Sequence, residues 1–96
     1  MSTTYQPTGP FVQVTSTTTP QTVAVTNPNN SQTVRVSNYS ANLLNFQINS
    51  EYNTIISANA VVYVSAINQL SPGNISVIIS QLAGTGNVYL QAVNQY

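Results

Sequence analysis

Apolar residues recur at every second position in several short stretches of the chain. Three of these stretches, at residues 11–15, 22–26 and 33–37, each place two valines on one side and small or polar residues on the other. A period of two is typical of β-strands with one buried face. The same period continues in four later stretches, carried by Leu44, Phe46 and Ile48, by Val62, Val64 and Ala66, by Ile75, Val77 and Ile79, and by Val88, Leu90 and Ala92. The pattern predicts seven strands and allows an eighth, short strand at residues 53–57.

Clusters of proline, glycine and asparagine separate these strands, at residues 19–20, 27–30, 38–42, 71–74 and 83–87. Proline fixes φ, whereas glycine and asparagine tolerate left-handed turn positions, so each cluster ends one strand and redirects the chain. Strands spaced about ten to twelve residues apart, without a helical period, are typical of all-β sandwiches and barrels. We therefore expect an antiparallel β-sandwich of about seven to eight strands with jelly-roll or immunoglobulin-like topology.

The chain of 96 residues has room for one hydrophobic core. Residues 11–96 are expected to form a single sandwich domain. Residues 1–10 contain Pro7 and Pro10 and lack a strand pattern, so they are expected to form an extended N-terminal arm. In an assembly, Tyr5 would give this arm an aromatic anchor for a neighbouring subunit.

Charged side chains make up only 2% of the chain, against roughly 25% in an ordinary domain. Asparagine, threonine, serine and glutamine replace them and account for 45 of the 96 residues. The formal net charge is zero, which removes the self-repulsion that keeps a domain apart from its copies. This composition favours a protein that assembles with other subunits.

The missing residue types exclude several functions. The chain has no His, Cys, Asp or Lys, so it cannot build a Ser-His-Asp triad, a carboxylate dyad, a Schiff base or a zinc site. A single arginine cannot supply the basic surface that nucleic-acid binding needs. We expect a protein that is not an enzyme, uses no cofactor or metal, and binds no nucleic acid.

Neither a signal peptide nor a membrane span is apparent in the sequence. The first ten residues lack basic residues and an apolar segment, and the longest apolar run, residues 60–64, is far too short to cross a bilayer. We expect synthesis in the cytoplasm of the producing cell and no membrane partner.

Apolar residues also occur on strand faces opposite the expected core, at Leu43, Val61, Tyr63, Ile67, Ile78, Tyr89 and Val93. A strand that is apolar on both faces usually has both faces covered. The chain has little sequence left for this, so we expect these residues to contact a neighbouring subunit of a homo-oligomer. The alternative is that one or two of these strands lie centrally under long loops.

Arg35 and Glu51 are the only charged side chains, and Arg35 faces away from the valines of its strand. One interpretation is an ion pair between the two, which contributes about 0–1 kcal/mol when exposed. The other places Arg35 in a subunit interface, where its guanidinium donates hydrogen bonds to backbone carbonyls or to a partner's acid.

Four segments have a familiar arrangement: Thr33-Val-Arg-Val-Ser-Asn38, Leu70-Ser-Pro-Gly73, Ile75-Ser-Val-Ile78 and Ala83-Gly-Thr-Gly-Asn-Val-Tyr89. In outline, over roughly residues 20–93, the chain resembles the small β-sandwich decoration (cement) proteins of tailed bacteriophage capsids. The resemblance implies a structural virion protein that binds the major capsid protein on the outer capsid surface. It also implies a homo-oligomer, often a trimer, that stabilises the shell. Residues 1–10 would be the arm that contacts the capsid.

Other functions remain open. One is a carbohydrate- or receptor-binding module of a phage tail fibre, with Tyr39, Tyr52, Tyr63 and Tyr89 as a sugar platform. Another is a filament or matrix protein that assembles through strand edges. An enzyme would have only Glu51 as an acid or base.

Overall fold

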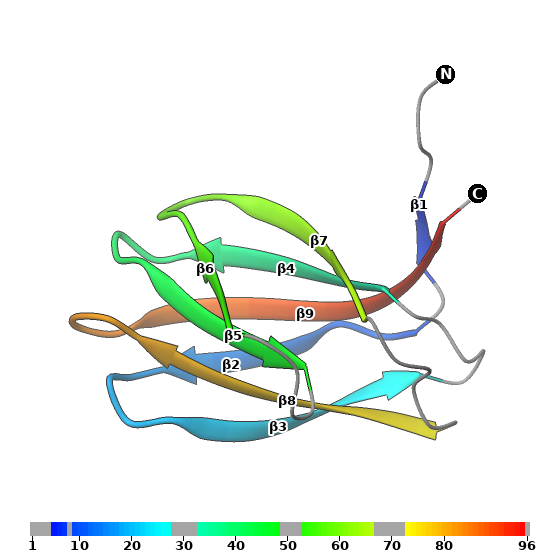
Figure 1. Cartoon of the computed structure of the whole chain (residues 1–96), viewed down its shortest axis with the longest axis horizontal. Helices are drawn as coiled ribbons and strands as arrows, with labels where there is room; N and C mark the ends of the chain where they lie inside the picture. The colour runs from blue at the N-terminus through cyan, green and yellow to red at the C-terminus, as the bar shows by residue number, and fades with distance from the viewer. Residues whose placement is uncertain (1–4, 8, 28–32, 49–52, 67–72, 96) are drawn as a thin grey trace.

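Two antiparallel sheets pack face to face in the computed structural model, which describes residues 5–7, 9–27, 33–48, 53–66 and 73–95 (Figure 1). No helix occurs within these ranges. The all-β sandwich predicted from the alternation of apolar and polar residues is therefore confirmed.

The strands follow the predicted stretches closely, and the short eighth strand is present. The first sheet contains β1 (Tyr5–Pro7), β2 (Val12–Ser16), β4 (Thr33–Tyr39), β7 (Val61–Ser65) and β9 (Gly86–Gln95). The second sheet contains β3 (Gln21–Asn27), β5 (Leu44–Ile48), β6 (Thr54–Ile56) and β8 (Gly73–Gln81). Only β1 lacks a counterpart in the sequence pattern.

The strand order identifies the topology. The first sheet has the order β2-β9-β4-β7, with β1 also paired to β9, and the second has the order β3-β8-β5-β6. From β2 to β9, every connection crosses to the other sheet except the one between β5 and β6. This alternation is the jelly-roll arrangement of two interleaved Greek keys, not the immunoglobulin arrangement.

The core lies between the two sheets and is made of the apolar positions that alternate along the strands. Phe46 of β5 is the largest fully buried side chain. The core residues are Val25, Val34, Val36, Leu44, Phe46, Ile48, Ile56, Ile75, Val77, Ile79, Val88, Leu90 and Ala92. Because strand side chains alternate strictly between faces, the residues between these positions must point outward, and they form the two outer surfaces of the molecule.

A buried polar network closes one end of the sandwich, where β4 ends. Asn38 is fully buried, and its Nδ2 donates hydrogen bonds to the carbonyl oxygens of Asn42 (2.9 Å) and Ser57 (3.0 Å). Its Oδ1 accepts a hydrogen bond from Ser40 Oγ at 2.7 Å. These bonds fix the backbone on both sides of Tyr39, whose side chain is exposed.

The N-terminal strand β1 pairs with the end of β9, near both termini (Figure 1). Pro7 is the register partner of Val93, and beyond it Gln91 Nε2 donates a hydrogen bond to the carbonyl oxygen of Gly9 at 2.9 Å. In this conformation residues 5–7 are extended and paired with their own chain.

Candidate functional site

The outer face of the first sheet carries three aromatic rings, Tyr89 on β9, Tyr39 on β4 and Phe11 directly before β2. Tyr89 of β9 has Gln13 of β2 and Ser37 of β4 as its register partners. Phe11 precedes Gln13 by two residues, and Tyr39 follows Ser37 by two residues. Both rings therefore lie diagonally across from Tyr89. Their centroids are 6.3 Å and 5.3 Å from that of Tyr89, with interplanar angles of 89° and 71°. Edge-to-face pairs across a strand diagonal are a favourable aromatic arrangement.

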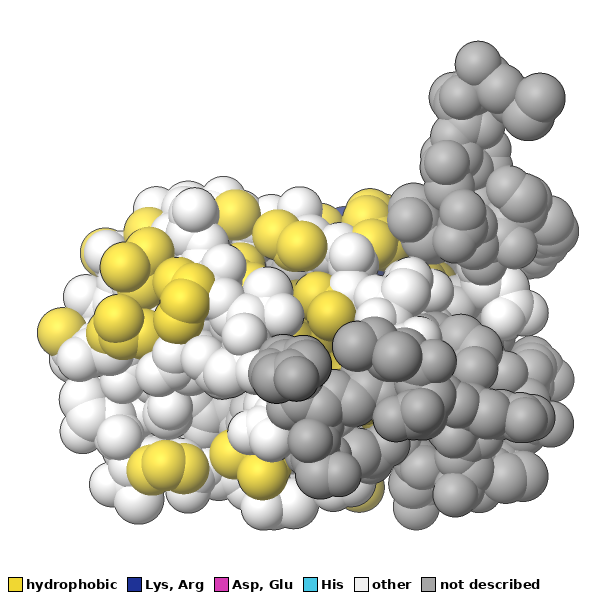
Figure 2. Space-filling model, in the orientation of Figure 1, with side chains coloured by type: hydrophobic (Ala, Val, Ile, Leu, Met, Phe, Trp, Pro, Cys, Tyr) yellow, Lys and Arg dark blue, Asp and Glu magenta, His cyan; other side chains and the backbone are white. Residues whose placement is uncertain are grey.

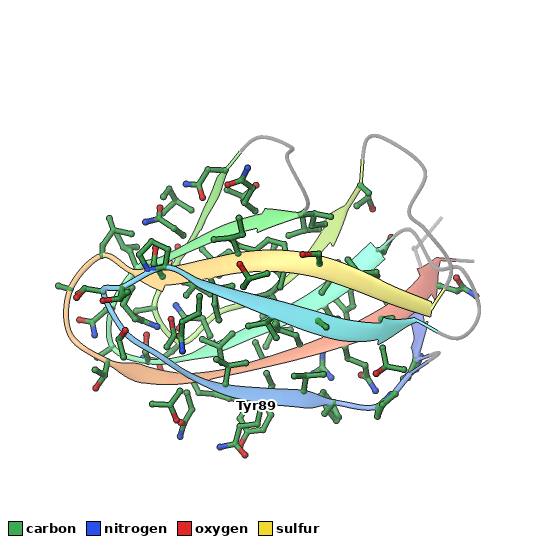
Figure 3. All side chains as sticks on the ribbon, turned by 90° about the horizontal axis from the view of Figure 1, so that it is seen from below. Tyr89 is labelled. Atoms are coloured by element: carbon green, nitrogen blue, oxygen red, sulfur yellow. The ribbon has the colours of Figure 1, made fainter. Side chains whose placement is uncertain are left out.

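An open pocket of about 490 Å³ lies against these rings and is lined by Phe11, Tyr39, Asn87 and Tyr89. We call it the aromatic pocket. Phe11 and Tyr39 are 54% and 55% exposed, which is high for such large apolar groups. Figure 3 shows Tyr89 on the side of its sheet that faces away from the other sheet. The volume falls within the range of small-ligand sites, roughly 300–1,000 Å³.

The side chain of Arg35 lies beside the aromatic pocket. The guanidinium carbon of Arg35 lies 5.7 Å from the centroid of the Phe11 ring, within the range of a cation–π interaction. Arg35 is half-buried, and its Nε has no hydrogen-bond partner. Glu51, its predicted ion-pair partner, lies outside the described residues, so that pair stays a prediction.

The outer face of the second sheet carries a second apolar surface, formed by Leu43, Ile55 and Leu82, which are 43%, 51% and 49% exposed. We call it the aliphatic patch. The backbone N–H of Leu82 donates a hydrogen bond to the carbonyl oxygen of Leu43 at 3.0 Å. Ile55 is the register partner of Asn45, two residues from Leu43 on the same face. Figure 2 shows hydrophobic side chains gathered at this end of the face, near β6.

Neutral amides border the aliphatic patch. Asn53 Nδ2 donates a hydrogen bond to Asn45 Oδ1 at 2.9 Å, and Asn45 Nδ2 donates to Ser80 Oγ at 3.4 Å. An apolar centre with a polar, hydrogen-bonded rim is the usual composition of a protein–protein interface.

The residues predicted to contact other subunits do not form one surface. The outer face of the first sheet holds Arg35, Val61, Tyr63 and Tyr89, whereas that of the second holds Leu43 and Ile78. Pro7 and Pro10 are exposed on the N-terminal segment. The structure does not describe Ile67 or the side chain of Tyr5.

Val93 differs from the other predicted contact residues because it is only 1% exposed within the single chain. Its register partners are Pro7 of β1 and Thr33 of β4. The side chain lies on the outer side of β9 and outside the core cluster. In this conformation the chain itself leaves Val93 no surface to offer a partner.

Sequence reasoning missed Phe11, Ile55, Leu82 and Asn87 as surface residues. The alternation of inward and outward side chains along the strands could have identified three of them as exposed. Phe11 alternates with Val12, Ile55 lies next to a residue whose side chain is buried, and Leu82 continues the outward series of β8. The position of Asn87 beside the rings could be predicted only from the strand order, because the three rings come from separate segments of the chain.

Comparison of the chain with protein-family models, with curated protein sequences and with solved structures finds no match. Within the described ranges, no helix is long and apolar enough to cross a membrane. The same residues contain no group of three or more side chains of the types that ligate metals. What the chain does is therefore inferred from the aromatic pocket and the aliphatic patch.

Proposed function

We propose that this chain is a structural protein of a bacteriophage particle, which binds the outside of the capsid as an oligomer and stabilises the shell. One observation carries this proposal: Leu43, Ile55 and Leu82 form an exposed aliphatic patch with a neutral polar rim. Contiguous exposed apolar side chains of this kind mark sites of contact with other proteins.

The energetics favour many weak contacts. Covering the exposed half of one leucine or isoleucine contributes about 1 kcal/mol, and a neutral hydrogen bond contributes about 0.5–1.5 kcal/mol. Each contact between two copies through the aliphatic patch would be modest, whereas the oligomer that these contacts form gains strongly when it engages a capsid lattice at several points. The zero net charge leaves no long-range repulsion between copies.

The capsid and the trimer come from the resemblance to decoration proteins, and the jelly-roll topology is compatible with a capsid protein. Jelly rolls occur among viral capsid and lectin domains. The proposed partners are the major capsid protein and further copies of this chain, and the proposed location is the outer surface of the virion.

Co-sedimentation with capsids from the particles of its source tests the attachment. We expect the chain to sediment with capsids, and to do so equally at low and high salt because so few charges are involved. Recovery of the chain only in the unbound fraction would contradict the proposed partner.

Size-exclusion chromatography with light scattering tests the oligomer. We expect an oligomer at micromolar concentration that dissociates when Ile55→Gln and Leu82→Gln are combined. Ala24→Gln is the matched control, because Ala24 is exposed on the outer face of the same sheet but lies on β3, away from the aliphatic patch. A wild-type chain that stays monomeric would contradict assembly.

A further inference from the structure

The aromatic pocket is not used by the proposed contact between copies, which lies on the opposite sheet. Phe11 and Tyr39 are more than half exposed, and the rings meet edge to face around Tyr89 instead of stacking. All three rings line the pocket. We propose that the aromatic pocket binds a neutral saccharide, so that the chain presents a sugar-binding site in addition to its role in assembly.

The rings match the apolar side of a sugar. A pyranose ring presents a face of C–H groups, and such a face packs against an aromatic ring with a large contact area and little loss of side-chain entropy. The guanidinium of Arg35 lies over the Phe11 ring, on one side of Tyr89. Tyr39 stands on the other side, so a sugar in the pocket meets rings from three segments of the chain.

The polar groups match sugar hydroxyls. Thr15 Oγ1 lies 3.4 Å from Asn87 Oδ1, to which it donates a hydrogen bond, and Asn87 lines the pocket. Gln13, the exposed register partner of Tyr89, adds a second amide on the same face. An amide both donates and accepts hydrogen bonds, as a hydroxyl does, so two amides and the tyrosine hydroxyls can pair with a polyhydroxy ligand.

Charge and rigidity favour a neutral sugar over other small ligands. The pocket lining has no charged side chain, and Arg35, the one charge nearby, is engaged with Phe11. A phosphorylated or acidic ligand would find no other basic side chain in the sequence. Tyr89 lies on a central strand of its sheet, and the hydrogen bonds of the buried Asn38 hold the backbone beside Tyr39. A site held in this way is formed before the ligand arrives.

A glycan array that carries neutral and acidic glycans provides the first test. We expect binding to neutral glycans. The free form of the strongest neutral glycan is then titrated into the ¹⁵N-labelled chain, and the largest NMR shifts are expected at Phe11, Tyr39, Asn87 and Tyr89. Tyr39→Ala should weaken the affinity roughly tenfold. Tyr39→Phe, which keeps the ring, should weaken it about twofold.

Tyr63, the register partner of Arg35, does not line the pocket but is too close to the Arg35–Phe11 contact to serve as a control. Thr22→Ala is the control, because Thr22 is exposed on β3, on the outer face of the other sheet. We expect its affinity to equal that of the wild type. Thermal unfolding of each variant confirms that it is folded. Three outcomes would overturn the sugar site: no neutral glycan binds, only acidic glycans bind, or Thr22→Ala weakens binding as much as Tyr39→Ala.

Capsid co-sedimentation of the same variants separates this site from the proposed attachment. We expect Tyr39→Ala to lose sugar binding and to sediment with capsids as the wild type does. If Tyr39→Ala instead loses only its capsid binding, the aromatic pocket is a protein contact and the sugar site is wrong. If neither the wild type nor any variant binds capsids, but Tyr39→Ala still loses sugar binding, the sugar site is supported and the proposed capsid attachment is wrong.

Discussion

Ser40 occupies the space into which a side chain at Gly86 would project. A β-carbon added to Gly86 would overlap the β-carbon of Ser40 and lie 3.0 Å from its α-carbon. Because the obstacle includes backbone, Gly86→Ala must displace the chain after β4. We expect the free energy of unfolding to fall by about 3 kcal/mol, as measured by urea denaturation.

Gly84 provides the comparison for this substitution. Its φ of +72° is unfavourable for alanine, and an added β-carbon would meet Asn42 Nδ2, the end of a side chain that can move. Gly84→Ala should therefore lower the stability by only about 1 kcal/mol. Equal losses from the two substitutions would show that Ser40 does not confine Gly86.

Asn38 is expected to be the polar residue whose loss destabilises the chain most. Asn38→Ala would remove the bonds that Nδ2 donates to the carbonyl oxygens of Asn42 and Ser57, and would take Asn38 Oδ1, their acceptor, from the buried N–H and Oγ of Ser40. Such losses cost about 1–3 kcal/mol per group, so we expect a decrease of about 3 kcal/mol in denaturant unfolding. Asn53→Ala, which removes one exposed bond, should change the stability by less than about 0.5 kcal/mol.

The sequence was sufficient to predict the core because a strand has only two faces. The alternating valines of β4 and the series Val88, Leu90 and Ala92 predict that one face of each strand is buried. In the structure these side chains are fully buried. The choice of jelly-roll topology was beyond the sequence pattern. It depends on pairings between distant segments, such as Val12 with Leu90, which local alternation does not encode.

The same limit explains why the sequence did not predict β1 or the aromatic pocket. Pro7 argues against a strand, yet β2 pairs with β9 only as far as Leu90, and β1 takes up the same edge from Val93 onward. At β1, pairing with β9 outweighs the low strand propensity of the local sequence. The ring of Phe11 was visible in the sequence, but its position beside Tyr89 follows only from the order of β2 and β9.

The contact between Arg35 and Phe11 should be weak but measurable in a double-mutant cycle. Arg35→Met keeps most of the side-chain length and removes the charge together with the unpaired buried Nε, whereas Phe11→Leu removes the ring. We expect a coupling free energy of about 0.5–1 kcal/mol from urea denaturation of the two single variants and the double variant. Strictly additive effects would mean that the two groups lie together without attraction.

Removal of β1 should expose the end of β9. A chain that lacks residues 1–7 leaves the β9 edge from Val93 to Gln95 unpaired and uncovers the side chain of Val93, which is now buried. We expect a loss of about 2 kcal/mol in unfolding free energy and faster hydrogen exchange of the amides at the end of β9. An unpaired edge also invites pairing with other chains, so association should rise with concentration in light scattering.

A shorter truncation separates the loss of β1 from the loss of terminal residues in general. Removal of residues 1–4 leaves the whole of β1 and its register with β9, from Tyr5 opposite Gln95 to Pro7 opposite Val93. Its stability and its exchange at the end of β9 should match those of the full chain. If the two truncations behave alike, the β1 pairing contributes nothing measurable. If only the longer one is destabilised, the short strand protects the β9 edge despite its unfavourable sequence.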